Sequence, residues 1–214
     1  MSTAERRRES ERSSTVVAPL LPLALLESIR AHDRPREVLE DENLAASLPR
    51  RLGLTGVVES QIRRYEEADR KGRSVPLDEV RDLLRLVLRR PDAAPILRDA
   101  GTRLAQGHRR RVSSAAVSVF GVLPGVTAAA ARRAARSLLR RIGASKVEVS
   151  GWPMEVRLRG GIAPGLEEAG TACTLYSAAL EELLTPYLRE RPALQHHRCQ
   201  AYGEEWCVWS WVEG

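Results

Sequence analysis

The chain has few cysteines, few aromatic residues and no long apolar run. Its three cysteines are an odd number, which argues against the paired disulfides of a secreted domain. No window approaches the roughly eighteen uninterrupted apolar residues of a membrane span, so we expect none. The apolar run at 16–26 contains prolines and leads directly into charged residues, which predicts the start of a helix rather than a signal peptide. These absences together predict a cytoplasmic protein.

The signatures of common enzymes are also missing. The chain has no G-x-x-x-x-G-K-[ST] phosphate loop, no G-x-G-x-x-G after a strand, no H-E-x-x-H and no G-x-S-x-G. Its carboxylates lie in pairs such as Glu66 and Glu67, which are typical of solvated helix faces. The sequence contains no recognisable motif for binding a nicotinamide or a flavin cofactor. We leave open whether the protein is an enzyme, and a non-catalytic binding role is favoured.

The positive charge of the chain is almost entirely arginine. The net charge is +6, and lysine occurs only at Lys71 and Lys146. Because the arginines alternate with acidic residues along predicted helices, they indicate solvated helix faces, and we expect no nucleic-acid partner. The basic run at 107–112 is either a helix end or a small patch that meets an acidic ligand group.

Changes in composition divide the chain into three parts. Residues 1–15 are polar and charged without periodicity, which predicts a disordered tail. Residues 16–76 predict an N-terminal helical region that ends in a turn at 71–76. Residues 77–214 form the remaining domain.

Within that domain, helical periodicity gives way to alternation with a period of two. The segments 146–150 and 154–158 read as strands, 171–188 reads as a helix, and the chain closes with a hairpin. This order predicts an α+β fold in which helices pack on a small antiparallel sheet. Gly101 lies inside a helical pattern, where glycine costs about 1 kcal/mol relative to alanine. It therefore predicts a close approach of another helix or of a ligand.

The closing hairpin, at 195–212, holds the densest chemistry of the chain. Gly203 supplies the conformational freedom of a tight turn, and Cys199 and Cys207 are equidistant from it. If the strands pair symmetrically about Gly203, the two cysteines face each other across the ladder. Three of the four tryptophans lie in the second strand, which indicates a packed hairpin. Cys173 can reach this site if its helix packs on the sheet.

Three thiolates and one imidazole would make a closed tetrahedral zinc site. Strand alternation places His197 on the same face as Cys199, whereas His196 needs a bulge to join it. The spacing is not C-x-x-C, so the chemistry leaves other readings open. The thiols could act as small apolar residues, Cys199 and Cys207 could form a redox-labile pair, or one cysteine could be a nucleophile.

The hairpin resembles a known family. The pattern C-x3-G-E-x2-C-x-W, from Cys199 to Trp209, resembles the closing signature of the 4-vinyl reductase domain family. The segment 96–102, with its central Ala-Gly, is similar to a helix of that family, and the resemblance covers roughly 77–214. It implies a TRAPP-like α+β fold, often dimeric, with a hydrophobic pocket between helices and sheet.

The resemblance also implies a ligand set for structural zinc. Sensor members of the family bind zinc through positions that correspond to Cys173, His196, Cys199 and Cys207, with glutamate where this chain has His196. Because the intervals match, the resemblance favours His196 over His197, with a bulge that brings it to the site. The metal would staple the Cys173 helix to the hairpin.

The ligand class follows from the same resemblance. The middle of the chain is similar in layout to the bacteriochlorophyll branch of the family, although 141–147 departs from it. This implies a hydrophobic aromatic or tetrapyrrole ligand and a role in bacteriochlorophyll biosynthesis, in the handling of vinyl chlorophyllide. Candidate pocket residues, each of which also suits a plain core, are Trp152, Tyr176, Leu104, His108 and Phe120. Two alternatives are a stand-alone ligand sensor or adaptor that acts through homodimer or partner contacts, and a true 4-vinyl reductase.

Overall fold

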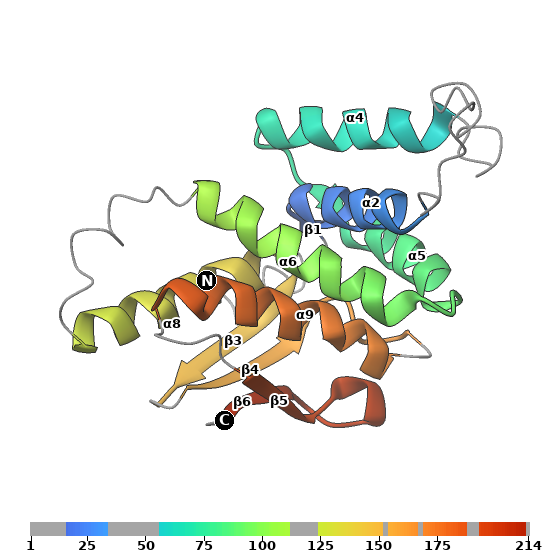
Figure 1. The fold of residues 1–214 in the computed structure, drawn as a ribbon. Coiled ribbons are helices and arrows are strands. Elements are labelled where there is room, and N and C mark those ends of the chain that lie inside the picture. The colour runs from blue at the N-terminus through green and yellow to red at the C-terminus, as the bar shows by residue number, and fades with distance from the viewer. Residues whose placement is uncertain are drawn as a thin grey trace, which may run out of the picture.

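The computed structural model describes most of the chain. The described ranges are 16–33, 56–111, 124–151, 154–166, 169–187 and 193–212. Within them the fold is α+β and ends in strands, as the sequence predicted (Figure 1). It has six α-helices and two small antiparallel sheets. The predicted tail at 1–15 lies outside the described residues.

The helices and strands alternate in groups. The α-helices are α2 (Leu20–His32), α4 (Gly56–Arg70), α5 (Leu77–Leu88), α6 (Ala93–Arg111), α8 (Pro124–Arg141) and α9 (Ala169–Leu184). The strands are β1 (Val16–Val17), β2 (Val75–Pro76), β3 (Ala144–Ser150), β4 (Glu155–Gly160), β5 (Ala193–Arg198) and β6 (Cys207–Val212). Two 3-10 turns, η1 (Thr185–Tyr187) and η2 (Gln200–Tyr202), follow α9 and β5.

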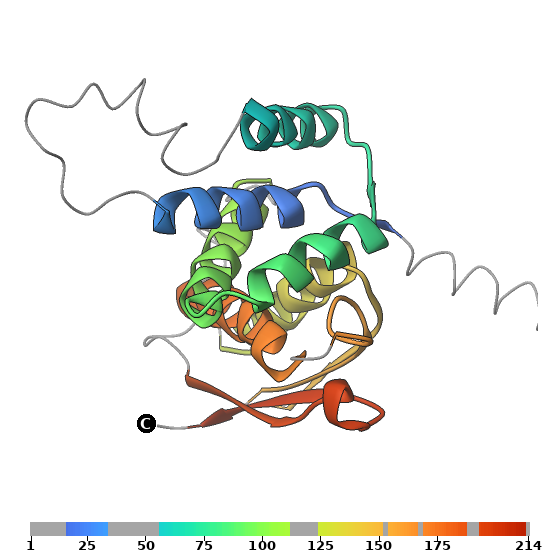
Figure 2. The same cartoon turned by 90° about the vertical axis from the view of Figure 1, so that its right-hand side faces the viewer.

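The larger sheet has the order β3-β4-β6-β5, and all its neighbours are antiparallel. Helices α8 and α9 cover one face of it, α6 packs on α9, and α2, α5 and α4 lie farther from the sheet (Figures 1 and 2). One cluster of buried apolar side chains runs through these layers, from Val17 and Leu21 to Leu194 and Trp209. The helical region at 16–76 and the rest of the chain therefore share one core.

The first sheet is a two-residue pairing that the sequence did not reveal. Val16 and Val17 of β1 pair with Pro76 and Val75 of β2 where a simple turn was expected. The side chains of Val17 and Val75 are buried, and β-branched residues suit such a half-covered strand. This pairing joins the start of α2 to the start of α5.

Gly101 allows α6 to lie directly on α9. A Cβ atom at this position would contact the backbone of Leu175 and would lie 2.9 Å from Cβ of Ala178. The predicted close approach at Gly101 is therefore that of a helix. Among the described residues, no helix has both the length and the apolar character needed to cross a membrane.

Candidate metal centre

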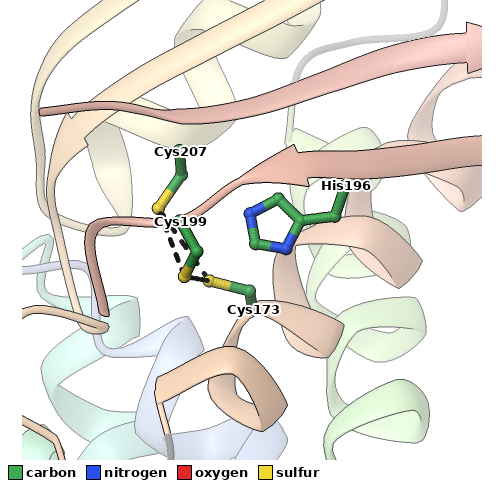
Figure 3. A group of neighbouring side chains, drawn as sticks. All are labelled: Cys173, His196, Cys199 and Cys207. Carbon is green, nitrogen blue, oxygen red and sulfur yellow. Dashed lines mark hydrogen bonds between the residues drawn. The ribbon is translucent and has the colours of Figure 1, made fainter. Parts of the chain in front are cut away.

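The hairpin and α9 bring together four residues that could hold a metal ion. They are Cys173, His196, Cys199 and Cys207, and one ligand atom of each lies within 4.8 Å of the others. Cys173 comes from α9 and the other three come from β5, β6 and the link between them (Figure 3). The three cysteine side chains are buried, and His196 is half-buried. The ligand set predicted from the sequence is thus assembled in one place.

The distances between the sulfur atoms fit a metal better than a disulfide. Sγ of Cys173 lies 3.5 Å from Sγ of Cys199 and 4.0 Å from Sγ of Cys207, and the last two are 4.0 Å apart. A tetrahedral ion with metal–sulfur bonds of about 2.3 Å would hold its sulfurs about 3.8 Å apart. In a disulfide the two sulfur atoms lie only about 2.05 Å apart. The three thiols are therefore spaced as ligands of one ion.

A shift in strand register places His196 on the side of the cysteines. Arg198 pairs with Val208, symmetrically about Gly203, but His196 pairs with Trp209, one residue out of that symmetry. The shift between His196 and Arg198 turns His196 toward the core face, and His197 is exposed. The sequence predicted a bulge if His196 was to be the fourth ligand, and this register shift is such a bulge.

His196 has a buried nitrogen that lacks a partner. Its Nε2 atom is buried and forms no hydrogen bond. An unpaired buried imidazole nitrogen is costly unless something binds it, and a metal ion would satisfy it. The donor set and this orphan atom both fit a cation held between α9 and the hairpin.

Trp209 fixes the orientation of the histidine ring. The two rings stack, with centroids 4.5 Å apart and an angle of 12° between their planes. Nε1 of Trp209 donates to Oγ of Ser177 at 2.9 Å, and that hydroxyl donates to the carbonyl of Cys173 at 3.3 Å. Trp209 thereby links His196 to the helix that carries Cys173. Such supporting contacts tune many metal sites.

The pKa values of the three thiols are shifted in different directions. Hydrogen bonds from Cys173 lower the pKa of Cys207 to about 5, against burial, with a smaller contribution from His196. The same donor lowers the pKa of Cys199. The pKa of Cys173 is raised, because its proton serves both neighbours and because the thiol is buried. The backbone N–H of Gln200 also donates to Sγ of Cys207 at 3.3 Å. These shifts favour the thiolate form, the form that binds a metal ion, at Cys207 and Cys199.

Three of the five predicted pocket residues lie within the described ranges. Tyr176 is fully buried, and its hydroxyl accepts a hydrogen bond from the N–H of Ile162 at 3.0 Å. Leu104 and His108 are buried in α6. Trp152 and Phe120 lie outside the described residues. A ligand pocket at these positions stays a prediction.

Comparisons with known proteins add no relative. No family model, curated protein or solved structure matches the chain. The case for the site rests on its residues and their geometry. Sequence reasoning missed the positioning role of Trp209, and the signal for it was the concentration of tryptophans in one strand.

Proposed function

We propose that the chain is a zinc-stapled module of the 4-vinyl reductase type, with a TRAPP-like fold. It binds a hydrophobic aromatic or tetrapyrrole small molecule, and its role is the handling of vinyl chlorophyllide in bacteriochlorophyll biosynthesis. The module is non-catalytic, acts as a homodimer and resides in the cytoplasm. The observation that carries the proposal is the buried Cys3His cluster between α9 and the hairpin.

Zinc is the ion that this donor set suits best. Thiolates with one imidazole are typical of tetrahedral structural zinc, whereas Mg²⁺ and Ca²⁺ prefer oxygen ligands. Zinc would supply no reactive position here, because four protein ligands complete its coordination. Cys173 would bind it from α9, and His196, Cys199 and Cys207 would bind it from the hairpin.

The cysteines of the metal centre come from two segments that are far apart in the sequence, α9 and the hairpin. Cys173 and Cys207 are 34 residues apart in sequence, and their sulfur atoms lie 4.0 Å apart. The cytoplasmic placement is supported by the odd number of cysteines, which does not suit the paired disulfides of a secreted domain. The ligand class and the fold family are supported by the hairpin pattern from Cys199 to Trp209.

Metal analysis tests the zinc. We expect about one zinc per chain, by inductively coupled plasma mass spectrometry, in tag-free protein purified without chelator. Cys207→Ser should lower this content, and Ser210→Ala, on the same strand, should not. The zinc proposal fails if the wild-type protein carries none, or if Cys207→Ser leaves the metal content unchanged.

Pigment binding tests the ligand. Divinyl chlorophyllide should bind saturably and quench tryptophan fluorescence, with no consumption of added NADPH. Consumption of NADPH together with loss of the vinyl group would instead favour the true reductase. If neither chlorophyllide nor protoporphyrin binds, the ligand class is wrong while the zinc result stands.

A further inference from the structure

A polar cavity of about 260 Å³ lies where β1 and β2 meet the last turns of α4, α6 and α8. We name it the arginine cavity. Its charged lining residues are Asp69, Arg73, Arg111, Arg140 and Arg141. None of the four metal ligands lines it. Its volume is slightly below that of pockets for drug-sized ligands, so it suits a smaller molecule.

The positive charges of the cavity are mostly unneutralised. Asp69 forms an ion pair with Arg111. In the part of the chain that the structure describes, the guanidinium groups of Arg73, Arg140 and Arg141 form no ion pair. Four arginines thus face one carboxylate, and three positive charges are left without a lining partner.

Helix dipoles account for only part of this charge. Helices α4, α6 and α8 all end beside the cavity, at Arg70, Arg111 and Arg141. Each helix C-terminus carries about half a negative elementary charge, so three termini would offset about half of the three free cations. A net positive potential remains, in a concave site where it is focused.

Two groups near the cavity have a lowered pKa. Burial lowers the pKa of Arg111, and the charge of Arg141 lowers it further. Burial and then Arg141 also lower the pKa of His108, a buried residue in the last turn of α6. Both shifts have the direction expected beside the positive charge of Arg141.

The cavity also offers an acceptor. Oδ1 of Asp69 is buried and has no hydrogen-bond partner, while Oδ2 meets Arg111. A protonated oxygen of a bound phosphate could donate to Oδ1, and the arginines could donate to its other oxygens. Guanidinium groups match the oxygens of phosphate and carboxylate in paired hydrogen bonds.

We propose that the arginine cavity binds a small ligand through an oxyanion group, a phosphate or a carboxylate. The ligand is held by Arg73, Arg140 and Arg141, with Asp69 as the acceptor for a protonated oxygen. The cavity size favours a compact anion of two or more charges over a nucleotide-sized ligand. This inference goes beyond the proposed function and does not depend on the metal.

Calorimetric titration of the full chain tests the site. The probes are pyrophosphate, citrate, and phosphatidylcholine vesicles with and without phosphatidic acid, all at matched ionic strength. The first two distinguish phosphate from carboxylate, and the vesicles test whether the phosphate belongs to a lipid headgroup. Arg73→Gln and Arg140→Gln should each raise the Kd about tenfold, the effect expected for one lost charge-assisted hydrogen bond.

Arg133→Gln is the matched control. Arg133 is exposed on α8, does not line the cavity and forms no ion pair among the described residues, so its loss removes the same charge. It should leave the Kd nearly unchanged. The proposal is overturned if no probe binds saturably at millimolar concentration, or if Arg133→Gln weakens binding as much as Arg73→Gln. The second outcome would show diffuse attraction to an arginine-rich surface, as for nucleic acid.

Discussion

The metal centre buries its polar atoms, whereas the arginine cavity keeps most of its charges in contact with water. In the metal centre four ligand atoms converge within 4.8 Å, and the three cysteines are almost fully buried. In the cavity Arg73, Arg140 and Arg141 are exposed and lack ion-pair partners among the described residues. Buried polar atoms stabilise a fold only when they are bound to something, while exposed charges contribute little. The two sites should therefore differ sharply in what they contribute to stability.

The largest expected effect is the loss of a thiol that joins α9 to the hairpin. Cys173→Ser should lower the free energy of unfolding in zinc-containing buffer by about 4 kcal/mol or more, because the metal no longer binds the folded state. Urea denaturation followed by circular dichroism measures this. A variant that keeps its zinc and stays within about 1 kcal/mol of the wild type would contradict a structural role for the centre.

The next largest effect is a difference in zinc affinity between variants of two neighbouring histidines. His196→Ala should weaken zinc binding by more than about 100-fold, since even residues that only support ligands alter affinity by about 10- to 100-fold. His197→Ala should change it little, because His197 is exposed and lies at the register shift between His196 and Arg198. Competition with a chromogenic zinc chelator measures both variants. Equal losses would show that the strand can present either histidine.

A smaller effect is the dependence of the free energy of unfolding on pH through His108, near the arginine cavity. The pKa of His108 lies below its ordinary value of 6.5, through burial and then through Arg141. The unfolded chain therefore binds the proton more tightly, so this stability is present above pH 6.5 and is lost as the pH falls. The slope should reach at most about 1.4 kcal/mol per pH unit.

His108→Gln should reduce that slope, as measured by urea unfolding between mildly acidic and neutral pH. His32→Gln is the control, because His32 is exposed at the end of α2. A slope that both variants leave unchanged would mean that His108 does not resist protonation. Saturation of the arginine cavity by pyrophosphate should also raise the pKa of His108, because it neutralises Arg141.

The smallest effect concerns the cavity arginines themselves. Arg140→Gln should change the free energy of unfolding by no more than about 0.5 kcal/mol, since the side chain is exposed and unpaired within the described residues. Thermal unfolding in phosphate-free buffer measures this. A loss of about 2 kcal/mol would show that the arginine supports the fold, and the contrast with the metal centre would fail.

The hairpin could be read from sequence because its information is local. The spacing of Cys199 and Cys207 about Gly203 placed the two thiols together, and the register next to them is symmetric about that glycine. Strand alternation alone would have chosen His197. The one-residue shift that selects His196 depends on how the strand packs, and only the intervals to the cysteines indicated it.

The arginine cavity could not be read in the same way. Asp69, Arg73, Arg111 and Arg140 come from three helices and a turn, and each looks like a solvated helix end in its own segment. The pairing of β1 with β2, a backbone hydrogen bond from Ala18 to Arg141 and the ion pair of Arg111 with Asp69 bring these ends together. Strands of two residues carry no periodic signal. The sequence showed only a basic run at 107–112.

The register shift at His196 has a consequence for aggregation. Strand β5 is one of the two edge strands of the four-stranded sheet, and it begins only after residues outside the described ranges. A slip of one residue would exchange its inner and outer faces and turn Leu194 toward water. An outer strand that has lost its register is a template for pairing with other chains. A metal ion bound to His196 would hold this register and would thus also protect the protein from self-association at this edge.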